Sequence, residues 1–337
     1  MRRSRPLLLA ALWSMVAGGV GAQDIHFTQF FHTPLATNPG LMGAFDGDHR
    51  VHAVFRQQWR AVTRPYRTFG LGYDASNAFG TQGLGLGLWL FNDKAGDSRL
   101  NTFQLAAGPS WTLSPGQGRH AVTAGVQVGF TALSLNDDQL SFDAQYNGFY
   151  HDPTMATNEE FQRASLVHPD LHAGVAYRFR VAPRQQVQAG LGLFNLTRPR
   201  IGFLGSPPEP LDLRTTFHLT GQLPLSTALD LLPTVQYMAQ GRFRELLLGA
   251  LVRYILVDRY GTLRAVRLGG SFRMADAGTV YAGLEYDQWT AGLSYDINTS
   301  DLVPASRNRG GFEVTVGRVF RRKPAVPARF KACPHQL

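Results

Sequence analysis

Histidine, aspartate and serine side chains gather between residues 151 and 172, where their types would suit a metal site or a hydrolytic triad. The set comprises His151, Asp152, Ser165, His168, Asp170 and His172. A metal site needs its ligands at fixed distances, and a triad needs a serine, a histidine and an acid within hydrogen-bond reach. The spacing fixes neither geometry, and histidines in loops or polar interiors are far commoner. We therefore predict neither a metal site nor a catalytic site.

A glycine repeat at Gly83, Gly85 and Gly87 superficially resembles a phosphate-binding loop. Such loops have a different spacing and lead into a helix, whereas these glycines alternate with leucines. The sequence contains no P-loop, HExxH, paired CxxC or GxSxG motif. The glycines are explained more simply as small residues on one face of a strand, and we predict no enzymatic activity and no cofactor.

Alternation between apolar and small or polar residues is clearest from Ala121 to Leu133. One side of this strand would carry Val122, Ala124, Val126, Val128, Phe130 and Ala132, and the other Thr123, Gly125, Gln127, Gly129 and Thr131. A strand buried in a soluble parallel sheet would be apolar on both faces. This pattern instead indicates hydrocarbon on one side and polar filling on the other, and the length suits a tilted strand that crosses a bilayer.

The same pattern recurs after residue 48. It predicts strands over 51–60, 66–76, 83–92, 100–113, 121–133, 171–179, 187–195, 214–223, 229–239, 246–257, 264–274, 279–287, 288–297 and 312–320. Many have an aromatic residue near one end, as an interfacial girdle requires: Trp59, Trp111, Tyr177, Tyr286, Trp289 and Tyr295. A soluble β-sandwich is the alternative, but its solvent face would not be so rich in glycine. We predict an all-β fold, a transmembrane antiparallel β-barrel of about 14 strands over residues 49–320.

Polar stretches interrupt the strand pattern at 136–164 and 198–211, and we predict long loops there, outside the barrel or folded into it. Charged residues inside a barrel are expected to pair. The residues predicted to form such a structural network are Glu285, Asp287, Asp296 and Asp301 with Arg264, Arg267 and Arg273.

Net charge argues against a nucleic-acid partner. The formal charge is +9, but three basic residues lie within the first five positions and five more within residues 321–337. Residues 6–320 carry 25 basic and 24 acidic groups. A nucleic-acid surface needs a clustered basic patch, which is not evident in this balanced stretch.

Both ends of the chain have distinct compositions. Residues 1–22 combine early arginines, an apolar run and small residues before Ala22, which predicts a secretory signal peptide. Residues 321–337 are predicted to form a basic periplasmic tail. The tail holds Cys333, the only cysteine, so no internal disulfide can form.

Residues 23–48 do not alternate, and prolines and glycines break any regular element. Aromatic and leucine side chains in this segment nevertheless favour burial. We predict an irregular N-terminal segment that packs on or in the barrel.

Several motifs resemble those of a known family. The segment FTQFFHTPLATNPGLMG from Phe27 to Gly43, the FRQQW sequence from Phe55 to Trp59, and the pair Tyr73-Asp74 are similar to the opening of the PorP/SprF family of Bacteroidetes. GLSYDINTS from Gly292, GGFEV from Gly310 and ACP from Ala332 resemble its closing pattern, although His335 stands where an arginine often follows the proline. The resemblance runs from about Gln23 to the C-terminus, with its motifs at the two ends.

That resemblance implies an integral barrel of the cell outer membrane, in contact with outer-membrane lipid and working in the type IX secretion and gliding machinery. It implies that the protein assists export or surface anchoring of secreted cargo proteins that carry a C-terminal sorting domain, together with other type IX components. The family-motif residues are expected mainly to tie the N-terminal segment to the barrel wall, with direct cargo contact as the alternative: Phe27, Gln29, Asn38, Pro39, Arg56, Gln58, Trp59, Tyr295, Asp296 and Glu313.

A second function fits the same pattern. A barrel that transports hydrophobic small molecules, like FadL, would also combine an N-terminal plug with about fourteen strands. A lipid-modifying outer-membrane enzyme is a third reading, and Ser165, His168 and His172 are its only candidate residues.

Overall fold

The computed structural model describes residues 24–58, 60, 64–96, 100–114, 118–135, 142–150, 152, 154–157, 164–203, 207–259, 262–300 and 303–321. Trp59, His151, Asp301 and Cys333 lie outside the described residues, as do the predicted signal peptide and all but the first residue of the predicted tail.

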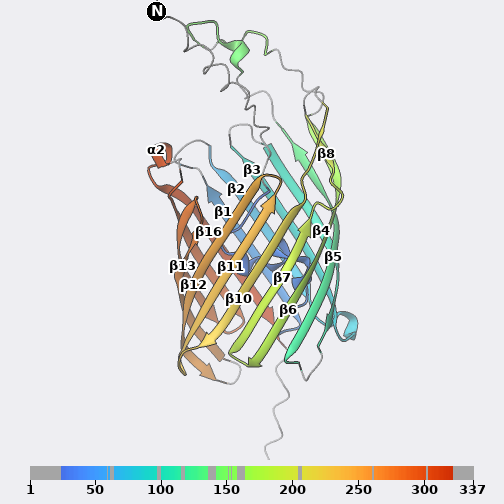
Figure 1. Ribbon diagram of the computed structural model, residues 1–337, viewed down its shortest axis with the longest axis vertical. Helices are drawn as coiled ribbons and strands as arrows, with labels where there is room; N and C mark the ends of the chain where they lie inside the picture. Colours follow the sequence, from blue (N-terminus) through green and yellow to red (C-terminus); the bar gives the residue numbers. More distant parts are fainter. Residues whose placement is uncertain are drawn as a thin grey trace, which may run out of the picture.

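Fourteen antiparallel strands of the described chain close into a barrel (Figure 1). They are β1 (His49–Gln58), β2 (Tyr66–Ala75), β3 (Leu84–Ala95), β4 (Leu100–Leu113), β5 (His120–Ser134), β6 (Ser165–Ala182), β7 (Gln185–Phe194), β10 (Arg214–Pro224), β11 (Leu229–Gln240), β12 (Phe243–Arg259), β13 (Thr262–Arg273), β14 (Ala277–Tyr286), β15 (Trp289–Asn298) and β16 (Arg309–Phe320). Each strand pairs with the next barrel strand in the sequence, and β1 pairs with β16 to close the ring. Closure satisfies the backbone hydrogen bonds that an open sheet edge would leave exposed to lipid. The predicted all-β barrel is confirmed.

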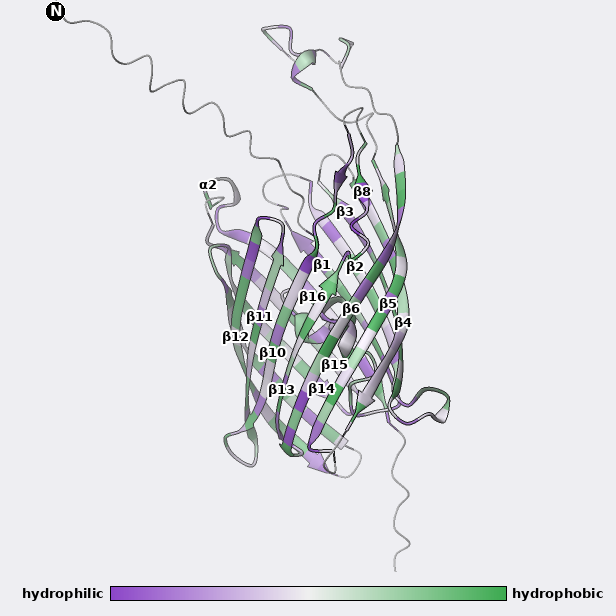
Figure 2. Ribbon diagram, turned by 45° about the vertical axis from the view of Figure 1, so that its right-hand side comes forward, coloured by the Kyte–Doolittle hydropathy of each residue, from purple (hydrophilic) through white to green (hydrophobic). Residues whose placement is uncertain are grey.

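The two faces of the wall differ as the alternation predicts. On β5, Val126 and Val128 point outward and are 42% and 59% exposed, whereas Gln127 between them points inward and is 1% exposed. Figure 2 shows the resulting alternation of hydrophobic and hydrophilic bands along the strands. The outward aromatic residues include Trp111, Tyr177, Tyr286, Trp289 and Tyr295. No helix in the described part of the chain is both long and apolar enough to cross a membrane.

Two sequence expectations need correction. β6 begins at Ser165, six residues before the strand that the alternation predicts from Leu171. His168 and Asp170 are buried and face the lumen, so they belong to the inward face of this strand. The predicted 198–211 loop contains the short pair β8 (Arg200–Ile201) and β9 (Glu209–Pro210), with β8 visible at the upper right of Figure 1.

The N-terminal segment, residues 24–48, lies inside the barrel and contains only short turns of helix. These are η1 (Phe30–His32), α1 (Pro34–Thr37) and η2 (Pro39–Leu41). Proline occupies the first position of α1 and of η2, where its fixed φ suits a helix start and its missing N–H costs nothing. The side chain of Asn38 accepts a hydrogen bond from Gly40 N–H and so caps η2.

Apolar side chains of this segment form a small core against the inner wall. Phe27, Leu35 and Met42 pack with wall residues Val54, Trp89 and Phe91. Phe27 meets Trp89 edge to face, with ring centroids 6.2 Å apart. Burying these side chains contributes to seating the segment because each loses most of its contact with water.

Leucine-to-arginine substitutions on the outer wall should report membrane depth. Leu268 in the middle of β13 and Leu113 at the end of β4 are 60% and 61% exposed. We expect Leu268→Arg to lower the free energy of unfolding by about 2–4 kcal/mol and Leu113→Arg by no more than about 1 kcal/mol, because the cost of a cation falls towards the interface. Denaturant titration in lipid vesicles, followed by the gel mobility of the unheated protein, measures both. Equal costs would contradict a lipid-facing belt.

Candidate functional site

An ion-pair cluster lies on the lumenal side of the seam where the barrel closes. Arg56 of β1 stands directly opposite Glu313 of β16 in the strand register, and Asp296 follows on β15. Arg56 donates from Nη1 to Glu313 Oε2 at 2.9 Å and from Nη2 to Asp296 Oδ2 at 3.2 Å. All three residues are buried: Arg56 and Glu313 are each 2% exposed, and Asp296 is 5% exposed. Charges withdrawn from water in this way are tolerated only when paired.

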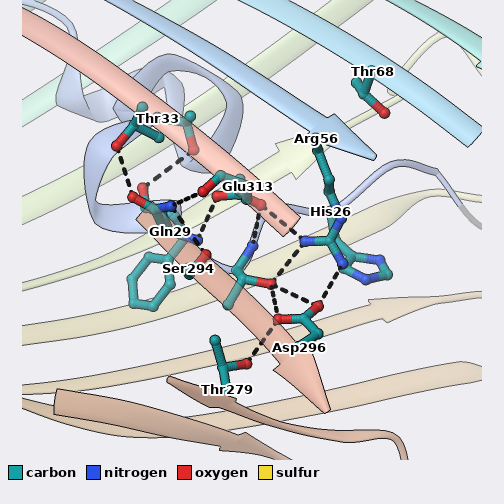
Figure 3. A network of polar contacts seen from close by, with 12 residues as sticks. His26, Gln29, Thr33, Arg56, Thr68, Thr279, Ser294, Asp296 and Glu313 are labelled. Carbon is teal, nitrogen blue, oxygen red and sulfur yellow. Dashed lines mark hydrogen bonds and ion pairs between the residues drawn. The ribbon is translucent and has the colours of Figure 1, made fainter. Parts of the chain in front are cut away.

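The cluster binds the backbone of the N-terminal segment (Figure 3). Thr28 N–H donates to Glu313 Oε2 at 2.9 Å, and Gln29 N–H donates to Oε1 of the same carboxylate at 2.8 Å. The Gln29 side chain donates to Ser294 Oγ at 3.0 Å and to the Glu313 backbone carbonyl at 2.8 Å, and it accepts from Thr315 Oγ1 at 2.7 Å. One carboxylate therefore holds both an arginine of the wall and two consecutive amides of the segment.

Arg273 of β13 extends the cluster along the wall, two strands from β15. It donates to Asp296 Oδ2 at 3.2 Å, to Thr28 Oγ1 at 2.8 Å and to Asp276 Oδ2 at 2.6 Å. Asp296 also accepts from Thr279 at 2.9 Å. With 2% of its side chain exposed, Arg273 supplies the second cation that the buried carboxylates need.

Two histidines of the segment contact the wall. His32 Nε2 lies 2.9 Å from Tyr281 OH, and the two rings stack with centroids 6.1 Å apart. His26 Nδ1 lies 3.5 Å from Glu245 Oε2. Both contacts add to the attachment of the segment on β12 and β14.

Asn38 makes a second attachment on the opposite wall. Its Nδ2 donates to the Val175 carbonyl at 2.9 Å and lies 3.1 Å from Nε2 of His218, while its Oδ1 caps Gly40. Thr216 Oγ1 donates to the Thr37 carbonyl at 2.6 Å beside it. Asn38 is fully buried, so these partners replace the water that its amide has lost.

Glycines on the inner wall make room for the segment. A Cβ on Gly174 would lie 1.9 Å from Asn38 Oδ1, and a Cβ on Gly125 would lie 2.3 Å from the Pro39 carbonyl oxygen. On β3, a Cβ at Gly87 would lie 2.6 Å from Met42 Sδ. Gly87 of β3, Gly125 of β5 and Gly174 of β6 therefore mark places where the segment approaches the wall closely.

A third attachment holds the end of the segment nearest β1. Asp74 accepts from Gly43 N–H at 2.8 Å and from Arg50 at 2.7 Å, and Arg50 also donates to the Leu41 carbonyl. Beyond it, the exposed Asp46 pairs with Arg178 and Arg180. The segment is thus attached to the wall along its whole length.

A separate charge network lines the lumenal side of β11, β12, β13 and β14. Arg253 pairs with Asp230 at 2.9 Å and with Glu285 at 2.7 Å, and Arg267 also pairs with Glu285. The group borders a cavity of about 900 Å³. Of the predicted network, Glu285 and Arg267 belong here and Asp296 and Arg273 belong to the seam cluster. Arg264 was wrongly assigned, since it is exposed and lies over the Tyr286 ring on the other face of β13.

The structure separates the ten family-motif residues into groups. Gln29, Arg56, Asp296 and Glu313 meet in the seam cluster, while Asn38 and Pro39 lie against the opposite wall. The others are dispersed: Phe27 is in the apolar core, Gln58 is half-buried beside Gly311, Tyr295 faces outward at 41% exposure, and Trp59 is outside the described residues.

Residues outside the ten family-motif positions complete the site, notably Thr28, Ser294 and Thr315. For Ser294 and Thr315 the sequence signal is the alternation of inward and outward residues along a strand. Ser294 stands two positions from Asp296, and Thr315 two positions from Glu313, so each shares the inward face of its strand.

Of the residues considered for chemistry, His168, Asp170 and His172 lie on the inward face of β6, whereas Asp152 lies in the β5–β6 connection. His168 Nδ1 lies 3.0 Å from Asp170 Oδ1, and Asp170 also accepts from Gln104 at 3.0 Å. His172 accepts from Asn195 N–H at 3.2 Å. Ser165 is exposed at the start of the strand. Within the described ranges, no group of three or more histidine, cysteine, aspartate or glutamate side chains is placed to hold a metal ion.

Comparisons with known proteins agree with this architecture. The family model for the type IX secretion system membrane protein PorP/SprF matches residues 19–317. Similar solved structures include the CymD monoaromatic hydrocarbon channel, with a TM-score of 0.51 at 10% identity over 91% of this chain and 96% of that one. The toluene transporter TodX of Pseudomonas putida gives a TM-score of 0.51 at 10% identity over 88% and 94%. At such low identity these two support the fold alone. No curated protein matched the sequence.

Breaking the seam pair should destabilise the barrel strongly and non-additively. We expect Arg56→Ala and Glu313→Ala each to cost about 3–5 kcal/mol, because each leaves a buried charge without its partner. The double variant should cost less than the sum of the two. Denaturant midpoints measure all three. Asp46→Ala, which removes an exposed pair, is the control and should cost no more than about 1 kcal/mol. Additive seam costs would contradict the coupling.

A methyl group at Gly174 should loosen the segment. Gly174→Ala places a Cβ against Asn38, whereas Gly278→Ala meets nothing closer than 4.0 Å and is the matched control. Residues 24–48 contain no lysine or arginine, so proteinase K is a better probe than trypsin. We expect faster cleavage within 24–48 for Gly174→Ala alone. Identical rates in both variants would show that the close contact is not needed.

Proposed function

Because this chain belongs to the PorP/SprF family of type IX secretion system membrane proteins, we propose that it assists the export or surface anchoring of particular cargo proteins at the outer membrane. The cargo would carry a C-terminal sorting domain, and other type IX components would deliver it. In this proposal the barrel is a non-enzymatic docking platform.

The occupied lumen is the observation that carries the proposal. The N-terminal segment is bound at the seam through Glu313, on the opposite wall through Asn38 and near β1 through Asp74. A folded or extended cargo chain cannot share this space without displacing the segment. Cargo is therefore expected to bind the exposed connections between strands rather than pass through the barrel.

The connection between β5 and β6 offers the most suitable surface. Its described part exposes large apolar side chains: Tyr146 at 56%, Phe149 at 91%, Tyr150 at 63% and Met155 at 39%. Aromatic residues are enriched at the centres of protein interfaces, and so many exposed together on one connection suit protein recognition. Residues 136–164 contain six acidic residues and one arginine, so a basic cargo surface would be complementary.

The family-motif residues fit a structural role in this proposal. Gln29, Asn38 and Arg56 are buried at 1%, 0% and 2% exposure, where cargo cannot reach them. Their contacts join the segment to the wall. We propose that the motif preserves the seated segment and that cargo choice depends on the exposed connections.

Transport of a hydrophobic small molecule is the second candidate, favoured by the fold shared with the CymD and TodX channels. It requires a continuous path through the barrel past the seated segment. A substrate-dependent flux across vesicles containing the purified protein, with no cargo co-purifying from envelopes, would favour transport over docking.

Co-purification of cargo tests the docking proposal directly. We expect the native protein, isolated from envelopes in mild detergent, to retain a secreted protein with a C-terminal sorting domain. Phe149→Ser combined with Tyr150→Ser should reduce the retained cargo at least tenfold, since losing an aromatic hot spot costs about 2 kcal/mol or more. The matched control is Phe79→Ser, 91% exposed in the β2–β3 connection at the opposite end of the barrel. Retention unaffected by the double variant, or lost equally in the control, would contradict this surface.

A further inference from the structure

The two ends of the barrel differ in the length of their connections. One end carries the connections 59–65, 96–99, 135–164, 195–213, 241–242, 274–276 and 299–308, and we call it the long-connection end. The other carries 76–83, 114–119, 183–184, 225–228, 260–261 and 287–288, and we call it the short-connection end. Bacterial outer-membrane barrels have short turns in the periplasm and longer loops outside.

The N-terminal segment starts at the long-connection end. Asp24 N–H donates to the side chain of Gln240, the last residue of β11, at 2.8 Å. Asn195, just after β7, donates to the Asp24 carboxylate at 2.8 Å. Arg214, the first residue of β10, lies 3.7 Å from that carboxylate and donates to the Ile25 carbonyl. All three partners stand at the same rim.

The same segment finishes at the opposite rim. Asp48 N–H donates to the carbonyl of Phe320, the last residue of β16, at 2.8 Å, and β1 then begins at His49. Arg321 donates to the Asp46 carbonyl at 2.7 Å. Residues 24–48 therefore cross the full height of the lumen before the first strand turns back through the wall.

We infer that the segment threads the barrel from the outer face to the periplasm, so that Asp24 lies at the extracellular mouth. Residues 24–48 therefore reach β1 from the extracellular side, through the lumen. Asp24, with its partners Asn195, Arg214 and Gln240, forms an outer latch. This latch lies beside the 195–213 connection, within reach of molecules outside the cell.

The latch differs in kind from the deeper attachments. The Asp24 side chain is 28% exposed, whereas the Asp296 side chain in the seam cluster is 7% exposed. The periplasmic end of the segment is covalently continuous with β1. An extracellular ligand would therefore meet the solvent-accessible Asp24 before it met the deeper attachments.

Single cysteines can locate this end. In a Cys333→Ser background, three variants are compared: Asp24→Cys in the latch, Arg242→Cys in an exposed long-connection turn, and Thr227→Cys in an exposed short-connection turn. A membrane-impermeant maleimide is added to intact cells. We expect Asp24→Cys and Arg242→Cys to be labelled, and Thr227→Cys to be labelled only after the envelope is opened.

A crosslink keeps the inference testable if Asp24→Cys is poorly reactive. Asp24→Cys combined with Gln240→Cys should be joined by a short bifunctional maleimide in the folded barrel, whose gel mobility shows that it has assembled. The inference is overturned if Asp24→Cys behaves like Thr227→Cys, if Arg242→Cys is protected in intact cells, or if the assembled double variant does not crosslink. None of these readouts depends on cargo, so they stand apart from the proposed function.

Discussion

A single buried carboxylate joins closure of the barrel to occupation of its lumen. Glu313 pairs with Arg56 across the β1–β16 seam and accepts the N–H groups of Thr28 and Gln29 from the lumenal segment. A buried carboxylate is stable only when its oxygens are satisfied by charge and by hydrogen bonds. The ion pair that closes the barrel and the hydrogen bonds that hold the segment therefore stabilise each other. The first strand, the last strand and the segment before the first strand behave as one unit.

The same constraint explains why the inner wall is polar where the segment touches it. The strands use their own backbone groups in the ladder, and the segment has too little regular structure to satisfy its own. Side chains of the wall must supply the missing partners. Ser110 donates to the Met42 carbonyl at 2.6 Å, just as Thr216 donates to that of Thr37. Polar inward residues and glycines together form a surface matched to an irregular backbone.

Most of the correct predictions came from the alternation of outward apolar and inward polar residues along each strand. It identified the barrel, its approximate strand number and the two faces, since hydrocarbon and lumen impose opposite demands on successive residues. The same alternation excludes Arg264 from the lumenal network, because Arg264 is an odd number of positions from Arg267 and Arg273 and so faces outward. The start of β6 is missed because that stretch contains Pro169, and a proline within a run weakens the strand pattern.

The seam cluster could not be derived in the same way. Residues 28, 56, 296 and 313 lie far apart in sequence, and only ring closure brings β1 beside β16. No local spacing encodes that meeting. The resemblance to a family pointed to Gln29, Arg56, Asp296 and Glu313 as a set, but not to their mutual contacts. Geometry supplied the reason why motifs at the two ends of the chain belong together.

Shared architecture with hydrocarbon channels does not decide what this barrel does, because function lies in sites placed on a fold. The informative features are specific to the lumen. At Gly125 the nearest obstacle to a Cβ is the Pro39 carbonyl, and at Gly40 of the segment it is the Val175 backbone. Backbone cannot swing aside as a side chain can, so the fit is specific to a seated segment. A channel whose segment left the lumen at each transport event would have no need for such close backbone contact. The fit therefore favours a barrel that binds its partners on the connections between strands.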